Sequence, residues 1–288
     1  MRENKHKKTV LAKWIMVVPI SLWMLLLVAV PFLIVLIISF MKSATYGGVE
    51  LGFSLKSYAG IMESTYLKVF LKSFFIAAFV TVICILIAYP FAYFIAGKTA
   101  VKKTVFMGMV MVPFCISSLI RLFSWITLLR RDGILNQFLL ALGIIKEPLK
   151  LVYNQTGAVI GLIYMLLPFM VLPLYSSIEK LDKTLLEACS DLGAKPVTGF
   201  LKVTLPLTRA GIFAGSILVF IPTLGLYFVT DLLGGSKTLL IGNVIRNQFI
   251  TARNWPMGSA LSMLLIFITL LLVGIYQKSG GNMDDLGV

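Results

Sequence analysis

Long uncharged stretches, separated by short polar segments, dominate the chain. A helix rises about 1.5 Å per residue and the hydrocarbon core of a bilayer is about 30 Å thick, so about 20 uncharged residues can cross a membrane. The stretches that meet this length, one of them interrupted by Arg121, are residues 14–41, 73–97, 104–129, 151–178, 210–230 and 254–277. The pattern predicts an all-α, polytopic membrane protein with six transmembrane helices.

Two shorter apolar pieces, residues 133–145 and 238–245, lie between charged residues. They are too short to cross a bilayer, so we expect them to be interfacial or re-entrant. The first long stretch follows a basic start and could be mistaken for a secretory signal. The apolar region of a signal is only about 7–15 residues long and ends at a cleavage site, so we interpret residues 14–41 as an uncleaved first span.

Composition supports a membrane protein, because 59% of the residues are hydrophobic and only 13% are charged, against roughly 25% charged in soluble domains. The net charge of +14 would ordinarily suggest a nucleic-acid partner. Here the basic residues fall in short loops, where they set membrane orientation, so we expect membrane lipid and no nucleic acid as a partner.

Basic residues are denser on one side of the predicted topology. The segments expected inside, residues 1–13, 98–104, 179–209 and 278–288, hold 14 Lys and Arg in 62 residues, while those expected outside, residues 41–66, 130–156 and 231–255, hold 9 in 78. This places the amino terminus in the cytoplasm. The predicted organisation is a basic cytoplasmic start (1–13), a transmembrane domain (14–278) with a cytoplasmic loop (179–209), and a cytoplasmic tail (279–288).

Several kinds of chemistry are missing from the sequence. Cys84, Cys115 and Cys189 form no Cys-x-x-Cys pair, and the one histidine, His6, lies in the basic start. A disulfide scaffold, a metal site and a histidine-based catalytic triad are therefore not expected. There is also no phosphate-binding loop of the GxxxxGK[ST] type, so we expect no cofactor in this chain, and any energy from ATP must come from a partner.

The loop 179–209 carries four acids and five bases. Thr184 and Glu187 have the spacing of a capping box, which predicts a helix start, and Gly193 predicts its left-handed end. Residues 197–203 predict a second short helical segment. The apolar side of this element lacks a partner in the chain, which favours a docking element, and the alternative is an ordinary ordered loop.

This loop resembles the EAA signature of ABC importer permeases. In that signature Glu-Ala-Ala is followed after three residues by Gly, then after nine residues by Ile, and then after one residue by Leu-Pro. Cys189 stands in place of the second Ala and Val203 in place of Ile, and the spacing is matched throughout. The resemblance implies a type I ABC importer fold in which this loop couples to ATPase subunits. The residues it assigns to coupling are Glu187, Ala188, Cys189, Gly193, Val203, Leu205 and Pro206.

Longer stretches, residues 167–182, 231–235, 241–245 and 254–256, resemble the B-type permease of spermidine/putrescine importers. The resemblance covers nearly the whole chain. It implies a non-catalytic, multi-pass subunit of the bacterial inner or plasma membrane that works by alternating access. The partners it implies are a homologous C-type permease, two ATP-binding subunits that bind ATP and Mg, an extracytoplasmic polyamine-binding protein and a polyamine substrate.

A path for a flexible polycation favours acidic oxygens and aromatic faces. Asp231 follows directly after Tyr227 and Phe228 at the end of the fifth stretch, where a carboxylate and two rings can meet a passing ammonium. The alternative is that Asp231 only caps a helix. Trp125 and Tyr175 are weaker candidates, because aromatic residues near span ends more often act as interfacial anchors or core residues.

Arg121 lies inside the third stretch, and a charge held in hydrocarbon must face protein or water. In the predicted topology Arg121 and Asp231 both lie in the outer half of the membrane. We therefore consider an ion pair between them that opens during gating.

Rival classes are less consistent with the sequence. A secondary carrier needs its own coupling-ion site and commonly shows an internal repeat, and neither is evident here. A membrane enzyme needs a catalytic constellation, which a single histidine in the terminal segment does not provide. ABC importer permeases for other solutes, such as iron, molybdate or sulfate, share the loop signature and remain an alternative.

Overall fold

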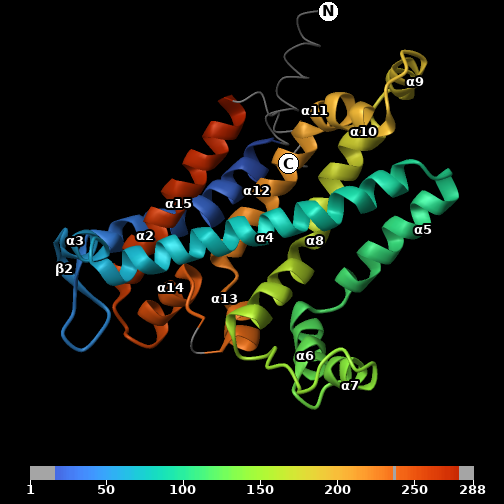
Figure 1. Cartoon of the computed structure of the whole chain (residues 1–288). Helices are drawn as coiled ribbons and strands as arrows, with labels where there is room; N and C mark the ends of the chain where they lie inside the picture. Colours follow the sequence, from blue (N-terminus) through green and yellow to red (C-terminus); the bar gives the residue numbers. More distant parts are fainter. Residues whose placement is uncertain (1–16, 236–237, 279–288) are drawn as a thin grey trace, which may run out of the picture. The chain divides into compact units, whose positions relative to one another are not determined.

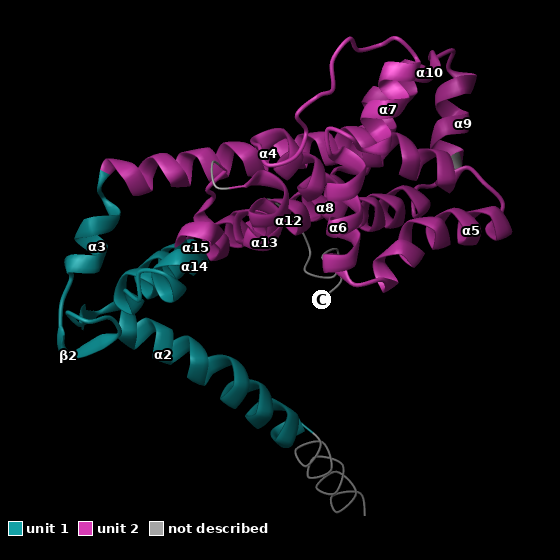
Figure 2. Cartoon of the chain, turned by 90° about the horizontal axis from the view of Figure 1, so that it is seen from below, with its two compact units in different colours: residues 1–63, 245–267 teal, residues 64–244, 268–288 magenta. Residues whose placement is uncertain are grey.

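The computed structural model describes residues 17–235 and 238–278, most of which are helical (Figure 1). The chain divides into two compact units, residues 1–63 with 245–267 and residues 64–244 with 268–288 (Figure 2). Four helices have the length and composition to cross a membrane, namely Val17–Ser39, Ser64–Ala96, Gln155–Glu179 and Trp255–Lys278. Two bent helix pairs bring the total to six if each pair is one span.

The first unit contains a hairpin that the sequence analysis did not predict. Its strands β1 (Met41–Ser43) and β2 (Val49–Phe53) pair antiparallel. The other elements are the π-helical turn η1 (Leu25–Ala29), α2 (Val30–Ser39), α3 (Lys56–Ile61), the end of α14 (Ile241–Ile250) and the start of α15 (Trp255–Lys278). The hairpin therefore falls in the segment 41–66, which the topology assigned to an outer loop.

The second unit is built around three packed helices, α4 (Ser64–Ala96), α8 (Gln155–Glu179) and α12 (Arg209–Gly225) (Figure 1). The remaining elements, apart from parts of α14 and α15, are α5 (Ala100–Met111), η2 (Val112–Cys115), α6 (Ser118–Leu129), α7 (Ile134–Ala141), α9 (Lys183–Asp191), α10 (Pro196–Gly199), η3 (Phe200–Thr204), α11 (Leu205–Leu207), α13 (Tyr227–Val229) and η4 (Thr230–Gly234). Fully buried residues such as Val80, Leu166 and Val219 join the three helices in one core.

A glycine permits the close approach of α12 and α8. A Cβ atom at Gly211 would lie 2.5 Å from the Ser177 Cβ and 2.8 Å from the Pro173 carbonyl oxygen. Small residues commonly stand where membrane helices pack closely. The sequence at this position therefore fixes the distance between two helices of the core.

The third expected span, residues 104–129, is not one straight helix. The chain bends by 96° between the helical segments Ala100–Cys115 and Ser118–Ala141. Pro113 lacks an amide donor and lies in the 3₁₀ turn η2, and Ile116 and Ser117 are extended. Because these residues interrupt the helix, Arg121 lies in the first turn after a break and not deep in a straight helix.

The fifth predicted span, residues 210–230, is also interrupted. A 62° bend separates Pro196–Leu207 from α12, and α12 ends at Gly225, three residues after Pro222. The chain then continues through α13 into the π-helical turn η4, which carries Asp231. Pro222 lies inside α12, where it cannot donate to the Leu218 carbonyl, and the helix ends where Leu226 adopts a non-helical ψ of 65°.

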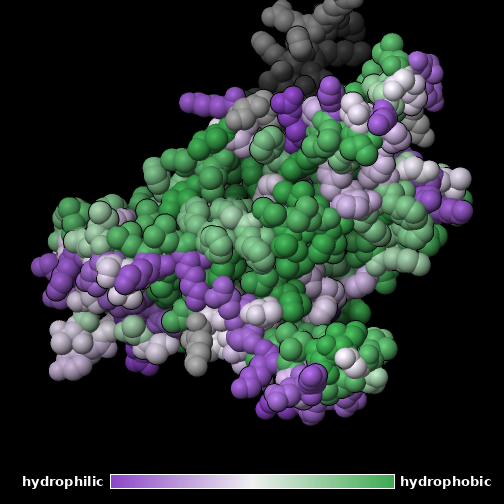
Figure 3. Space-filling model, viewed as in Figure 1, coloured by the Kyte–Doolittle hydropathy of each residue, from purple (hydrophilic) through white to green (hydrophobic). Residues whose placement is uncertain are grey.

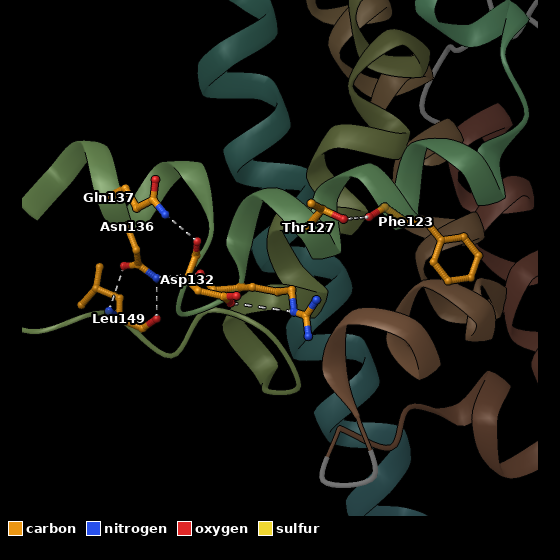
Figure 4. Close-up of polar contacts among 7 residues, drawn as sticks. Phe123, Thr127, Asp132, Asn136, Gln137 and Leu149 are labelled. Carbon is orange, nitrogen blue, oxygen red and sulfur yellow. Dashed lines mark hydrogen bonds and ion pairs between the residues drawn. The ribbon is translucent and has the colours of Figure 1, made fainter.

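The short apolar piece 133–145 folds as α7 and the turn after it, held by a buried amide (Figure 4). Asn136 is fully buried, and its Nδ2 donates to the carbonyl oxygens of Arg130 and Leu149 at 2.9 and 3.0 Å. The amide of Leu149 donates to Asn136 Oδ1 at 2.9 Å. This side chain ties the chain before α7 to the chain that follows it.

Candidate functional site

The first helix of the loop 179–209 is capped by a carboxylate. Asp182 Oδ1 accepts a hydrogen bond from the amide of Thr184 at 3.0 Å, and α9 begins at Lys183. Hydrogen bonds from the backbone and side chain of Thr184 lower the pKa of Asp182 below its ordinary value. The prediction that Thr184 caps the helix is therefore wrong, because Thr184 lies in its first turn.

The end of α9 follows the prediction. Gly193 has a φ of +75°, and its amide donates to the Ser190 carbonyl at 2.9 Å. The amide of Ala194 then donates to the Cys189 carbonyl at 3.0 Å, which satisfies two carbonyls at the end of the helix. A second helical segment begins at Pro196 and continues through η3 into α11, so the two-helix element is confirmed.

The segment from α9 to α10 exposes apolar side chains that are not covered by the described residues. Leu185, Leu192 and Val197 are exposed by 43%, 87% and 68%. Glu187, Ala188 and Gly193 are exposed as well, while Cys189, Val203, Leu205 and Pro206 are partly buried. The residues assigned to coupling therefore lie in two places: Glu187, Ala188, Cys189 and Gly193 on and after α9, all exposed except the partly buried Cys189, and the partly buried Val203, Leu205 and Pro206 where the loop returns to the core.

An ion pair lies at the base of this loop. Lys103 Nζ donates to both carboxylate oxygens of Glu179, at 2.6 and 2.8 Å, and so joins α5 to the end of α8. Lys103 and Glu179 line a cavity of about 320 Å³ together with Glu187 and Thr204. The sequence pattern did not predict this contact. Its only sign in the sequence is a charged residue directly before the stretch 104–129 and another directly after the stretch 151–178.

At the far end of α12, a buried amide organises the segment that carries Asp231. Asn243 is 1% exposed, and its Nδ2 donates to Asp231 Oδ1 at 2.6 Å and to the Tyr227 carbonyl at 3.2 Å. Its Oδ1 accepts from Thr230 Oγ1 at 2.8 Å and from the Leu240 amide at 3.0 Å. The sequence analysis missed this role of Asn243, which a lone amide in the apolar piece 238–245 could have signalled.

Three of the substrate-path candidates therefore come together. Asp231 and Tyr227 are exposed, and the rings of Tyr227 and Phe228 meet edge to face with centroids 6.3 Å apart. The other two candidates lie elsewhere. Trp125 packs on Tyr164 at 5.2 Å, and Tyr175 lines a cavity of about 880 Å³ between α8, α12 and the loop 179–209.

The expected ion pair between Arg121 and Asp231 is absent from this structure. The guanidinium carbon of Arg121 lies 4.1 Å from the ring centroid of Phe114 and 5.6 Å from that of Tyr164. Asp231 instead accepts the bond from Asn243, although α6 and η4 are neighbours. Arg121 is thus stacked on aromatic rings, where the sequence analysis expected a carboxylate.

Within residues 17–235 and 238–278, no three His, Cys, Asp or Glu side chains gather in a way that could hold a metal ion. The three cysteines are free thiols.

Comparison with known proteins identifies the family. The family model for the binding-protein-dependent transport system inner membrane component matches residues 88–278. The spermidine/putrescine transport system permease protein PotB of Escherichia coli (strain K12) is 42% identical over 264 residues, which cover 92% of this chain and 96% of that protein. PotB of Haemophilus influenzae is 40% identical over 89% of this chain and 90% of its own length.

Solved structures agree with the fold. A chain of a bacterial alginate ABC transporter, in complex with an alginate pentasaccharide-bound periplasmic protein, has a TM-score of 0.75 at 16% identity and covers 96% of both chains. A chain of another crystal structure of a bacterial alginate importer has a TM-score of 0.73. The expected all-α, polytopic fold and the non-catalytic transport role are confirmed. The chain belongs to the family of inner membrane components of binding-protein-dependent transport systems.

Proposed function

We propose that this permease carries polyamines as part of an ATP-driven importer. The observation that carries the proposal is the 42% identity to a spermidine/putrescine permease over 92% of the chain. The exposed carboxylate of Asp231 beside the rings of Tyr227 and Phe228 supports it, because a carboxylate and aromatic faces both attract an alkylammonium group.

The importer would contain a homologous C-type permease, two ATP-binding subunits and an extracytoplasmic polyamine-binding protein. ATP and Mg would bind to the ATPase subunits, and the chain itself would hold no cofactor. Closure of the ATPase subunits would move α9 and rotate the two permeases, so that the pathway between them opens alternately to each side.

The exposed face of α9 would dock on an ATPase subunit through Glu187 and Ala188, with the partly buried Cys189 next to them. Gly193 would set the direction in which the chain leaves α9, and Val203, Leu205 and Pro206 would anchor the return of the loop to the core. The exposure of Leu185 and Leu192 supports this role, because apolar side chains that lack a partner in their own chain fit a protein interface.

Asp231 would meet the ammonium groups of the substrate, and Asn243 would act as a positioning residue. The bond from Asn243 Nδ2 at 2.6 Å holds the Asp231 carboxylate, and the second bond, to the Tyr227 carbonyl, holds the backbone beside it. Trp125 and Tyr175 would contact the substrate elsewhere along the path.

The orientation that fits this function places the amino terminus in the cytoplasm. Segments 1–13 and 279–288 and the loop 179–209 would then lie on the ATPase side. Residues 14–278 would form one transmembrane permease domain, and η4 with Asp231 would face the binding protein.

The test is substrate-stimulated ATPase activity of the co-purified importer in lipid vesicles. We expect putrescine or spermidine, delivered by the binding protein, to stimulate hydrolysis, while molybdate and sulfate do not. Asp231→Asn and Asn243→Leu should raise the KM for polyamine, and Asp132→Asn, a change at an exposed carboxylate near α7, should not. Stimulation by anions alone would reject the polyamine substrate, and co-purification without any ATPase activity would reject the coupling role.

A further inference from the structure

Arg121 is a buried charge that has no acidic partner among the described residues. Its side chain lies in α6, and the residue is only 8% exposed. The guanidinium stacks over Phe114 and near Tyr164, yet its Nε and Nη1 atoms are buried without a hydrogen-bond acceptor among the described residues. A ring face attracts the cation but does not replace acceptors in the guanidinium plane, so these donors need a further partner.

The expected membrane spans offer no carboxylate for this role. None of the chain's 12 acids falls within the six stretches expected to span the membrane. Asp231 lies in η4, which neighbours α6, but it binds Asn243 and does not pair with Arg121. Glu3, Asp284 and Asp285 lie outside the described residues. Among the described residues, therefore, no carboxylate pairs with Arg121, and its Nε and Nη1 donors are left for another molecule.

The surroundings of Arg121 favour a protein over lipid. Leu119, Ile120 and Phe123 on α6 are 50%, 60% and 56% exposed, so the arginine is flanked by an apolar surface. The lobe that holds α6 and α7 is largely apolar on the face seen in Figure 3. Lipid tails can cover such a surface but supply no acceptor, whereas an arginine within an apolar patch is a frequent centre of protein interfaces.

We propose that Arg121 and the exposed face of α6 bind the companion permease, and that a carboxylate within a membrane span of that subunit pairs with the guanidinium. The proposal rests on the proposed function, which supplies the companion subunit. Arginine suits this contact because its planar group can pair with a carboxylate while it stays stacked on an aromatic ring. A small rotation of the side chain on assembly, common at interfaces, would bring its donors to the carboxylate.

The test is charge reversal in the assembled importer. Arg121→Glu should lower the amount of companion permease that co-purifies by about tenfold or more, because one charge of a buried pair is then reversed. In that background, each acid within the spans of the companion is replaced by Lys in turn, and we expect one replacement to restore co-purification and transport. The matched control is Arg130→Glu, because the Arg130 side chain is 61% exposed and lies 3.9 Å from Asp132.

Two results would overturn the proposal. One is that no acid-to-Lys replacement in the companion permease restores its co-purification with Arg121→Glu. The other is that Arg121→Gln co-purifies with as much companion permease as the wild type does. If an anionic lipid phosphate is the acceptor, activity will depend on anionic lipid in the wild type and not in Arg121→Gln, while the companion stays bound. Co-purification is measured without substrate, so it tests the pairing independently of the proposed function. If charge reversal rescues co-purification but polyamines do not stimulate ATP hydrolysis, the polyamine substrate is rejected and the pairing of Arg121 stands.

Discussion

Replacement of Gly193 by valine should uncouple ATP hydrolysis from transport without unfolding the permease. Gly193 ends α9 with a φ of +75°. A side chain costs roughly 1–2 kcal/mol in this left-handed region, and a β-branched one resists it most. A Cβ atom at this position would meet no other atom within 4 Å, so the cost is confined to the backbone.

The size of the effect follows from that cost. A destabilisation of 1–2 kcal/mol lowers the population of the present loop geometry by roughly 5- to 30-fold. Because none of the described side chains of α9, residues 184–191, is buried, the loop can relax to another direction. We therefore expect transport per ATP hydrolysed to fall by about tenfold, with membrane insertion and thermal stability unchanged.

The assay compares polyamine uptake with ATP hydrolysis in vesicles that contain the complete importer. The matched control is Gly193→Asn, because asparagine tolerates the left-handed region and the site has room for its side chain. A valine variant with the wild-type ratio of uptake to hydrolysis would refute the reasoning. Equal loss in both variants would also refute it, since the backbone conformation would then not be the cause.

Three further predictions concern stability. Lys103→Glu or Glu179→Lys should each lower the unfolding free energy in detergent by up to about 1 kcal/mol at low salt, and the double exchange should restore it. Gly211→Val should cost about 1–3 kcal/mol because its side chain would collide with α8, whereas Gly108→Ala, at an open position, should leave the melting temperature unchanged or raised. The pKa of Asp182 is lowered in the folded chain, so the stabilisation of α9 by this cap is fully present above the ordinary carboxyl pKa of about 3.9. This stabilisation is lost as the pH falls through the lower folded pKa. A spin label on α9 should show the loss, and Asp182→Asn should abolish the pH dependence.

Local patterns predicted much of the fold because membrane helices need long apolar runs. The stretch 151–178 corresponds to α8 at Gln155–Glu179, and the stretch 254–277 corresponds to α15 at Trp255–Lys278. The left-handed end at Gly193 was also predictable, since it depends only on neighbouring residues. The bend after η2 was not, because uncharged residues around Pro113 give the same apolar signal whether the helix is straight or broken.

The site residues that sequence reasoning missed are those whose partners lie far along the chain. Asn243 lies 12 residues from Asp231, and Lys103 lies 76 residues from Glu179, so no local period relates either pair. The pair of Arg121 with Asp231, expected because both were placed in the outer half of the membrane, is not formed in this structure. The fold places Phe114 and Tyr164 beside the guanidinium and Asn243 beside the carboxylate.

The charge distribution explains how a chain with a net charge of +14 can form part of a pathway for cations. Of its 26 basic residues, only Arg121 falls within the six apolar stretches that the sequence predicts to span the membrane. Within those stretches, repulsion of a polycation by this chain therefore comes from Arg121 alone. A carboxylate from the companion permease would neutralise that charge, and Asp231, held by Asn243, would then be the dominant charge that this chain presents to the substrate.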